Sequence, residues 1–135
     1  MCHIVSTNDG LRRKKVRDAV EYANKKNTQK KKVFISGKVT GCDDYIEKFK
    51  NAENALKEKY PDKIIINAIA MLDSVNATEW DHDDCMDVTL ALLSVCDEIV
   101  MLPDYSDSEG AIKEYRKATS LGLKVIFYES MFGDK

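Results

Sequence analysis

The sequence is short of residues that break secondary structure or cross-link a chain. Only two prolines and six glycines occur in 135 residues, so long stretches are free to form regular helices and strands. The four cysteines form no C-x-x-C pair, and their spacing matches no zinc pattern. Cys96 lies among apolar residues, where we expect a buried free thiol in a reducing compartment.

Long apolar runs are also missing. None approaches the roughly 20 residues that a membrane helix requires, and the first residues, MCHIVSTNDG, lack the basic-then-apolar layout of a secretory leader. We therefore expect a cytoplasmic protein without a membrane partner. A hydrophobic fraction of 44% and a charged fraction of 33% suit one globular domain with a sizeable core.

Charge is unevenly distributed along the chain. Residues 1–32 carry +7, whereas residues 33–135 carry −9, for a net charge of −2. A basic segment of this kind is typical either of an arm that binds nucleic acid or a membrane, or of a solvated helix with a polar linker. We favour the second interpretation because Tyr22 is the segment's only aromatic residue. Residues 1–31 are thus predicted to be a helical appendage, with a helix at 11–26, to a domain at 32–135.

Within that domain, short apolar runs alternate with segments of helical periodicity. Strands are expected at 32–36, 64–67, 98–102 and 124–128, and helices at 43–60, 78–97 and 109–121, with an irregular connection at 68–75. Asp43 or Asp44 and Thr78 are the expected caps of the first two helices. This order predicts an α/β fold: a three-layer, doubly wound, flavodoxin- or Rossmann-like parallel sheet of four to five strands with helices on both faces.

Ligands of such sheets bind at the carboxyl ends of the strands, where three loops should meet: 36–41, 67–74 and 103–110. The sequence has no G-x-G-x-x-G and no P-loop motif, which argues against a nicotinamide or P-loop nucleotide site. The run Asp81-His82-Asp83-Asp84 fans out around a helix rather than converging, so we expect no metal site there. No cofactor is expected.

The segment 108–114 is more informative. Ser108 falls where a helix begins, and its hydroxyl and the free N–H groups there suit a phosphate. Gly110 and Ala111 are small enough to let a ligand approach, and Glu114 lies further along the same helix. By itself this pattern is better explained by a capping serine and an exposed glutamate.

Four motifs occur together in one order: V-F-I-S-G-x-x-x-G, C-D-x-I-x-x-L-P, S-x-G-A-x-x-E and A-x-x-L-G-L-x-V-I. Over about residues 32–128 the chain resembles the nucleoside 2-deoxyribosyltransferase superfamily, most closely a branch of small uncharacterised bacterial and phage proteins. It is also similar to the 2′-deoxynucleoside 5′-monophosphate N-glycosidases.

The resemblance implies particular roles for individual residues. Glu114 would attack the anomeric carbon of the sugar, and Ser108 would bind a 5′-phosphate. The remaining substrate-binding residues would come from the three loops and the start of the last predicted helix: Ser36, Gly37, Lys38, Gly41, Asn67, Tyr105, Gly110 and Ala111. Relatives assemble as homodimers or larger homo-oligomers, so a homo-oligomer is expected here, with Met131 and Phe132 either at an interface or packed locally.

One position departs from the family's pattern. A second acid, which protonates the leaving base, should lie eight residues before Asp97, where the chain has Thr89. Asp87 is a poor substitute because it lies about 200° away around the helix. Losing a general acid costs about 10²–10⁴ in rate.

Two functions therefore remain open. The first is hydrolysis or transfer at the N-glycosidic bond of a nucleoside or nucleoside 5′-monophosphate, with Glu114 as nucleophile. The alternative is a nucleotide-binding or regulatory domain with weak or no turnover, which Thr89 favours. Nucleic-acid binding by residues 1–32 is a weaker third possibility.

Overall fold

The computed structural model describes residues 13–19 and 30–132. The chain divides into two compact units, residues 1–30 and residues 31–135. In the first unit, residues 13–19 are helical with exposed side chains, and the rest of the helix predicted at 11–26 lies outside the described residues. The second unit contains the sheet and the candidate site.

The sheet has four parallel strands. These are β1 (Lys32–Ser36), β2 (Ile64–Ile66), β3 (Glu98–Met101) and β4 (Lys124–Phe127), in the order β2-β1-β3-β4. The predicted α/β class and parallel sheet are confirmed. Because the winding direction reverses between β1 and β3, the carboxyl ends of these two strands border the crevice in which ligands of such folds bind.

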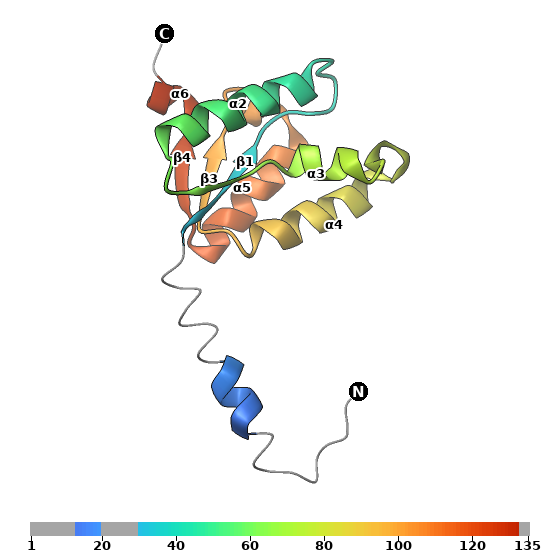
Figure 1. The fold of residues 1–135 in the computed structure, drawn as a ribbon. Helices are drawn as coiled ribbons and strands as arrows, with labels where there is room; N and C mark the ends of the chain where they lie inside the picture. Colours follow the sequence, from blue (N-terminus) through green and yellow to red (C-terminus); the bar gives the residue numbers. More distant parts are fainter. Residues whose placement is uncertain (1–12, 20–29, 133–135) are drawn as a thin grey trace. The chain divides into compact units, whose positions relative to one another are not determined.

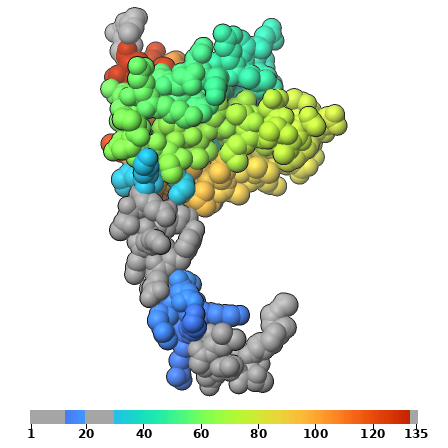
Figure 2. Space-filling view, viewed as in Figure 1, coloured from blue at the N-terminus to red at the C-terminus, as the bar shows by residue number. Residues whose placement is uncertain are grey.

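Helices cover both faces of the sheet and complete three layers (Figure 1). Helices α2 (Tyr45–Lys59) and α6 (Tyr128–Phe132) lie on one face, and α4 (His82–Leu93) and α5 (Glu109–Leu121) on the other. The short helix α3 (Ala68–Ser74) lies between α2 and α4 on the face shown in Figure 2. Two 3-10 turns, η2 (Ala77–Glu79) and η3 (Tyr105–Asp107), precede α4 and α5.

Each face of the sheet has its own hydrophobic core. Val33 and Ile35 of β1 point toward α2, whereas Phe34 between them points toward α5. All three side chains are buried, and each such burial stabilises the fold by about 1.5–3 kcal/mol. Met131 and Phe132 of α6 pack against the core on the α2 side. Of the two alternatives given above for these residues, the structure therefore shows local packing.

The structure corrects two predictions about helices. The segment 68–75, predicted to be irregular, contains α3 (Ala68–Ser74), because Asn67 caps it by accepting hydrogen bonds from the N–H groups of Ile69 and Ala70. Thr78 lies inside η2 and does not cap α4. Asp81 does so, by accepting a hydrogen bond from the N–H of Asp84 at 2.8 Å.

Two further features were anticipated from composition. Cys96 is a buried free thiol, and burial raises its pKa to about 11. Across the described ranges, no helix is both long enough and apolar enough to cross a membrane.

Candidate functional site

The site is centred on a hydrogen bond between two elements that meet at the crevice. Ser36 is the last residue of β1, and Glu114 lies on the inward face of α5. The Oγ of Ser36 donates to Oε1 of Glu114 at 2.6 Å, and both residues are buried. The structure therefore brings together two of the predicted site residues that are 78 positions apart in the sequence.

The surroundings of Glu114 favour its neutral form. Burial raises the pKa of its carboxyl to about 7, against the opposing effect of hydrogen bonding with Ser36 and Thr89. Burial dominates because a charged carboxylate loses far more hydration than two hydroxyl groups restore. At neutral pH the carboxyl is therefore divided between its protonated and ionised forms, a balance suited to a group that must change charge during a reaction.

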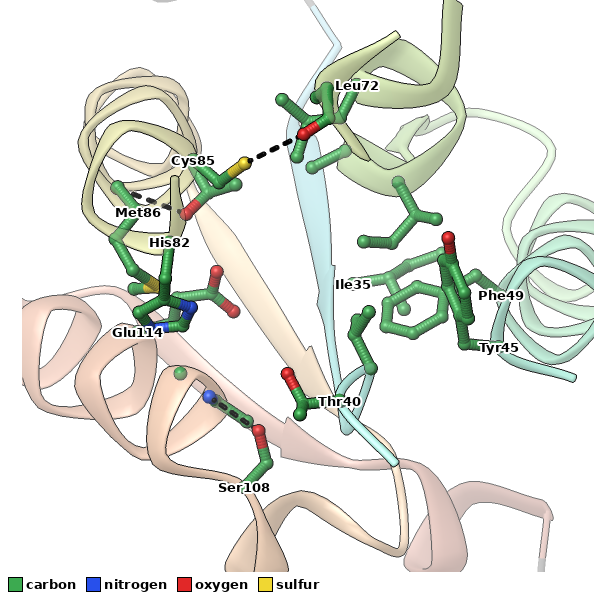
Figure 3. A pocket seen from close by; sticks show the side chains of 18 of the residues that line it. Ile35, Thr40, Tyr45, Phe49, Leu72, His82, Cys85, Met86, Ser108 and Glu114 are labelled. Carbon is green, nitrogen blue, oxygen red and sulfur yellow. Dashed lines mark hydrogen bonds between the residues drawn. The ribbon is translucent and has the colours of Figure 1, made fainter. Parts of the chain in front are cut away.

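A cavity of about 710 Å³ opens in front of this carboxyl, a volume within the range of small-molecule sites. Figure 3 shows Glu114 on one side of it, with Ile35, Tyr45 and Phe49 opposite. Most of the wall is apolar, and Trp80 adds an exposed aromatic side chain to it. A ligand with a flat apolar part and a polar part directed at Glu114 would fit such a wall.

The start of α5 forms another part of the cavity wall. Ser108 caps the helix as predicted, accepting a hydrogen bond from the N–H of Ala111 at 3.1 Å. Its hydroxyl proton stays available to a ligand. A Cβ at Gly110 would lie 3.3 Å from Sδ of Met86 and 4.0 Å from Cε1 of His82, so glycine keeps α5 close to α4 here.

The loop after β1 is fixed by close contact and by charge. A Cβ at Gly37 would lie 2.8 Å from Cδ1 of Leu102, so only glycine fits without a shift of the neighbouring chain. Lys38 does not line the cavity, and its Nζ pairs with Asp107, which does, at 2.7 Å. The hydrogen bond to Asp107 raises the pKa of Lys38 and lowers that of Asp107.

A second lysine ties the same two loops together. Lys48 of α2 pairs with Asp104 and donates to the carbonyl of Lys38 at 2.6 Å. The backbone N–H of Lys38 also donates to Asp104, at 3.1 Å. These contacts fix the loops after β1 and β3 relative to each other at the rim of the cavity.

Besides Ser36 and Lys38, three predicted substrate-binding residues do not line the cavity. Gly41 adopts a left-handed backbone, with φ of +79°, and has open space where a side chain would be. Asn67 caps α3 and donates to Glu53 at 3.1 Å. Tyr105 packs its ring against Phe127, with centroids 5.6 Å apart.

Thr89 occupies the position on α4 where the resemblance implies an acid. The residue is buried, lines the cavity near Glu114, and donates its hydroxyl proton to the carbonyl of Met86 at 3.2 Å. Asp87 is exposed and does not line the cavity. The described cavity wall therefore presents a hydroxyl, not a carboxylic acid, at this point.

The sequence analysis missed the wall formed by α3, η2 and the start of α4. The residues concerned are Ile69, Leu72, Asp73, Ala77, Trp80, His82, Cys85 and Met86. Two signals were present: Asn67 before Ala68 is a typical helix cap, and Ile69 and Leu72 are spaced by one turn. His82, Met86 and Thr89 share the spacing that places residues on one helix face.

Comparison with known sequences identifies the family. The sequence model of a family described as a domain of unknown function, DUF4406, matches residues 31–127, and the chain belongs to this family. No curated protein and no solved structure matches the chain. The family's description states no activity, so kinship with the nucleoside 2-deoxyribosyltransferases stays a prediction.

Proposed function

We propose that the protein cleaves or transfers the N-glycosidic bond of a nucleoside or nucleoside 5′-monophosphate, with Glu114 as the nucleophile. The observation that carries this proposal is the buried carboxyl of Glu114, held by Ser36 at 2.6 Å and facing a cavity of about 710 Å³. The resemblance described above gives the same residue the same role. A carboxyl that is buried, oriented and exposed to a ligand on one side matches the nucleophile of the carboxyl pair that retaining glycoside cleavage uses.

The chemistry assigns a task to each element of the site. The carboxylate of Glu114 forms a bond to the anomeric carbon as the base departs, and water then hydrolyses this ester or an acceptor base displaces it. Ser36 orients the carboxylate. The apolar wall around Phe49 and Trp80 would hold the base, and Ser108 with the start of α5 would hold the 5′ group.

The test is release of free base, measured by chromatography. Wild-type protein and Glu114→Gln are incubated with ribo- and deoxyribonucleosides, their 5′-monophosphates and nicotinamide nucleotides. Gln matches Glu in shape but cannot form the glycosyl ester, so we expect release by wild type and a loss of at least about 10³-fold in the variant. Equal release by both proteins would show that Glu114 is not the nucleophile.

One observation favours a second function, nucleotide binding without turnover. Thr89 stands where a proton donor is expected, and the raised pKa leaves Glu114 partly neutral. In that case calorimetry would detect a nucleoside or nucleotide that binds, and prolonged incubation would release no base. Such a result would replace the catalytic proposal.

A further inference from the structure

The structure holds information about the class of leaving base, and this inference rests on the proposed function. A neutral base leaves a sugar as an anion unless an acid protonates it, which is why N-glycosidases usually supply a general acid. A base that already carries a fixed positive charge leaves as a neutral molecule and requires no proton. The identity of the proton donors around Glu114 therefore bears directly on the substrate.

Thr89, the residue of α4 beside Glu114, cannot act as this donor. A hydroxyl has a pKa far above that of a catalytic acid, and the Thr89 hydroxyl lies within hydrogen-bond distance of the Met86 carbonyl, at 3.2 Å. Cys85, one turn earlier, donates its thiol to the carbonyl of Ala77 at 3.6 Å. Burial raises the pKa of this thiol, which makes it a weaker acid.

Among the residues of α4 that line the cavity, His82 is the remaining one with a side chain that could donate a proton. It lies at the start of α4, about two turns before Thr89. Its Cε1 lies 4.0 Å from the Cβ position of Gly110, in the first turn of α5. Gly110 precedes Glu114 by four residues, which is about 6 Å along the helix axis. His82 thus lies beside the first turn of α5, near Ser108, where the 5′ group of a substrate would lie.

The charge of the cavity wall points the same way. The charged side chains that line it, apart from His82, are all acidic: Asp73, Asp107, Glu109 and Glu114. No lysine or arginine lines it within the part of the chain that the structure describes. Lys38 pairs with Asp107, and Lys113 lies 4.0 Å from the exposed Glu109. Among the described residues, the lining carboxyl groups without a lysine partner are therefore those of Asp73 and Glu114.

Two aromatic side chains complete a site suited to a cation. Tyr45 from α2 and Trp80 after η2 both line the cavity, and Trp80 is 38% exposed. Aromatic faces attract cations, and tryptophan does so most strongly. Carboxylates together with accessible aromatic rings favour a flat, positively charged ring over a neutral one.

We propose that the substrate of this site is an N-glycoside whose base carries a fixed positive charge, such as an N-alkylated purine or a pyridinium. The bond between the anomeric carbon and the charged nitrogen breaks, and its electron pair stays on the nitrogen, which neutralises the base. Glu114 carboxylate forms the glycosyl ester. Water then hydrolyses the ester, giving the free sugar, the carboxylate and one proton released to solvent.

The experiment compares matched substrates on the full-length protein. The pairs are 7-methylguanosine with guanosine, and nicotinamide riboside with its uncharged dihydro form, each also tested as the 5′-monophosphate. We expect kcat/KM for the charged member to exceed that for the neutral member by at least about 10², the lower end of what a general acid contributes. A ratio near one, or a preference for the neutral member, would overturn the inference and leave the proposed function standing. Failure to cleave any member, while another nucleoside or nucleotide of the base-release panel is cleaved, would overturn the inference alone; failure to cleave any compound of either set would overturn both.

A variant tests the cause of this preference. Thr89→Asp places a carboxylic acid beside the cavity, and Thr89→Asn is the control of equal shape without an acidic proton. We expect the ratio of guanosine cleavage to 7-methylguanosine cleavage to be at least about tenfold higher in Thr89→Asp than in Thr89→Asn. An equal effect on both substrates would contradict the inference. If Thr89→Asp does not fold, the comparison of substrates on wild type decides by itself.

A His82 variant tests the alternative, that the site does contain a general acid. If His82 were the proton donor, His82→Gln would abolish cleavage of guanosine and remove the alkaline limb of its pH profile. We expect His82→Gln to leave the ratio of charged to neutral cleavage unchanged. Loss of neutral cleavage alone in this variant would show that the site has a general acid and would overturn the inference.

Discussion

The Oγ of Ser36 lies 2.6 Å from Oε1 of Glu114 and joins the end of β1 to the middle of α5. This contact crosses the crevice where the sheet order reverses, so a residue from each side of the switch point meets in one site. The hydrogen bond stabilises the ionised form of a carboxyl that burial otherwise holds neutral. Together with burial, it therefore sets the pH at which Glu114 ionises, as the proposed nucleophile must.

Removing that hydrogen bond should move the activity profile to higher pH. In Ser36→Ala the pKa of Glu114 rises further, since hydrogen bonds to charged groups contribute about 1.5–3 kcal/mol, equivalent to about one or two pH units. We expect the acid limb of kcat/KM, near the pKa of about 7 in wild type, to shift upward by about one unit. Ser36→Thr is the control because it keeps the hydroxyl, and a shift equal to that of Ser36→Ala would contradict this account.

Stability and activity should respond to pH in opposite directions. The pKa of Glu114 is raised in the folded state to about 7, above its ordinary value of 4.5. The protonated carboxyl therefore stabilises the fold fully below about pH 4, and this contribution, about 3 kcal/mol, is lost as pH rises through 7. Activity requires the ionised carboxyl and rises over the same upper part of the range.

Glu114→Gln separates these effects. Chemical denaturation across pH should show the wild type losing stability relative to Glu114→Gln between about pH 4 and 7. The charged and titratable groups of the cavity wall, Asp73, His82, Cys85, Asp107 and Glu109, are present in both proteins and cancel in the difference. A constant difference over this range would show that Glu114 has an ordinary pKa.

Asn67 should affect stability and not ligand affinity. Its side chain caps α3 and donates to Glu53. Asn67→Ala removes both contacts and should lower the free energy of unfolding by about 1–3 kcal/mol, with KM unchanged because the side chain lies outside the cavity. Asn67→Ser keeps the capping oxygen and should lose less. A large rise in KM for Asn67→Ala, with stability intact, would restore the predicted substrate-binding role.

Gly37 should be coupled to Leu102. A Cβ at Gly37 would come within 2.8 Å of the buried Leu102 side chain, so Gly37→Ala should destabilise the protein by about 1–3 kcal/mol. Leu102→Ala also destabilises by leaving a cavity, but it opens space for the new methyl group. The double variant should therefore be more stable than the sum of the two single effects predicts. Strict additivity would show that the close approach is not the cause.

Residues with strong local signals were placed correctly from the sequence. Ser108 and Gly122 bound α5 as predicted, because a capping serine and a glycine with a left-handed backbone act within one turn of the chain. The buried strands were equally clear, since parallel strands covered on both faces are continuously apolar. Their pairing in the order β2-β1-β3-β4 follows the usual right-handed crossovers.

What could not be predicted depends on contacts between distant segments. Nothing local shows that Asn67 turns toward Glu53, or that Tyr105 packs on Phe127 and not on a ligand. Asp81 and not Thr78 caps α4, because Thr78 lies inside η2 and α4 begins only after this turn. The cavity wall from α3 was missed for the same reason: a seven-residue helix is stable only with its neighbours packed around it.

The central claim is that Glu114 forms a covalent bond to the sugar, and intact-protein mass spectrometry tests it most directly. The protein is incubated with nucleosides carrying fluorine at the 2′ position, which slows hydrolysis of a glycosyl ester more than its formation, and is then quenched in acid. The account predicts a mass increase equal to one glycosyl group, located on the peptide containing Glu114 and absent in Glu114→Gln. Release of base from an unmodified protein, or an adduct on any other residue, would contradict it.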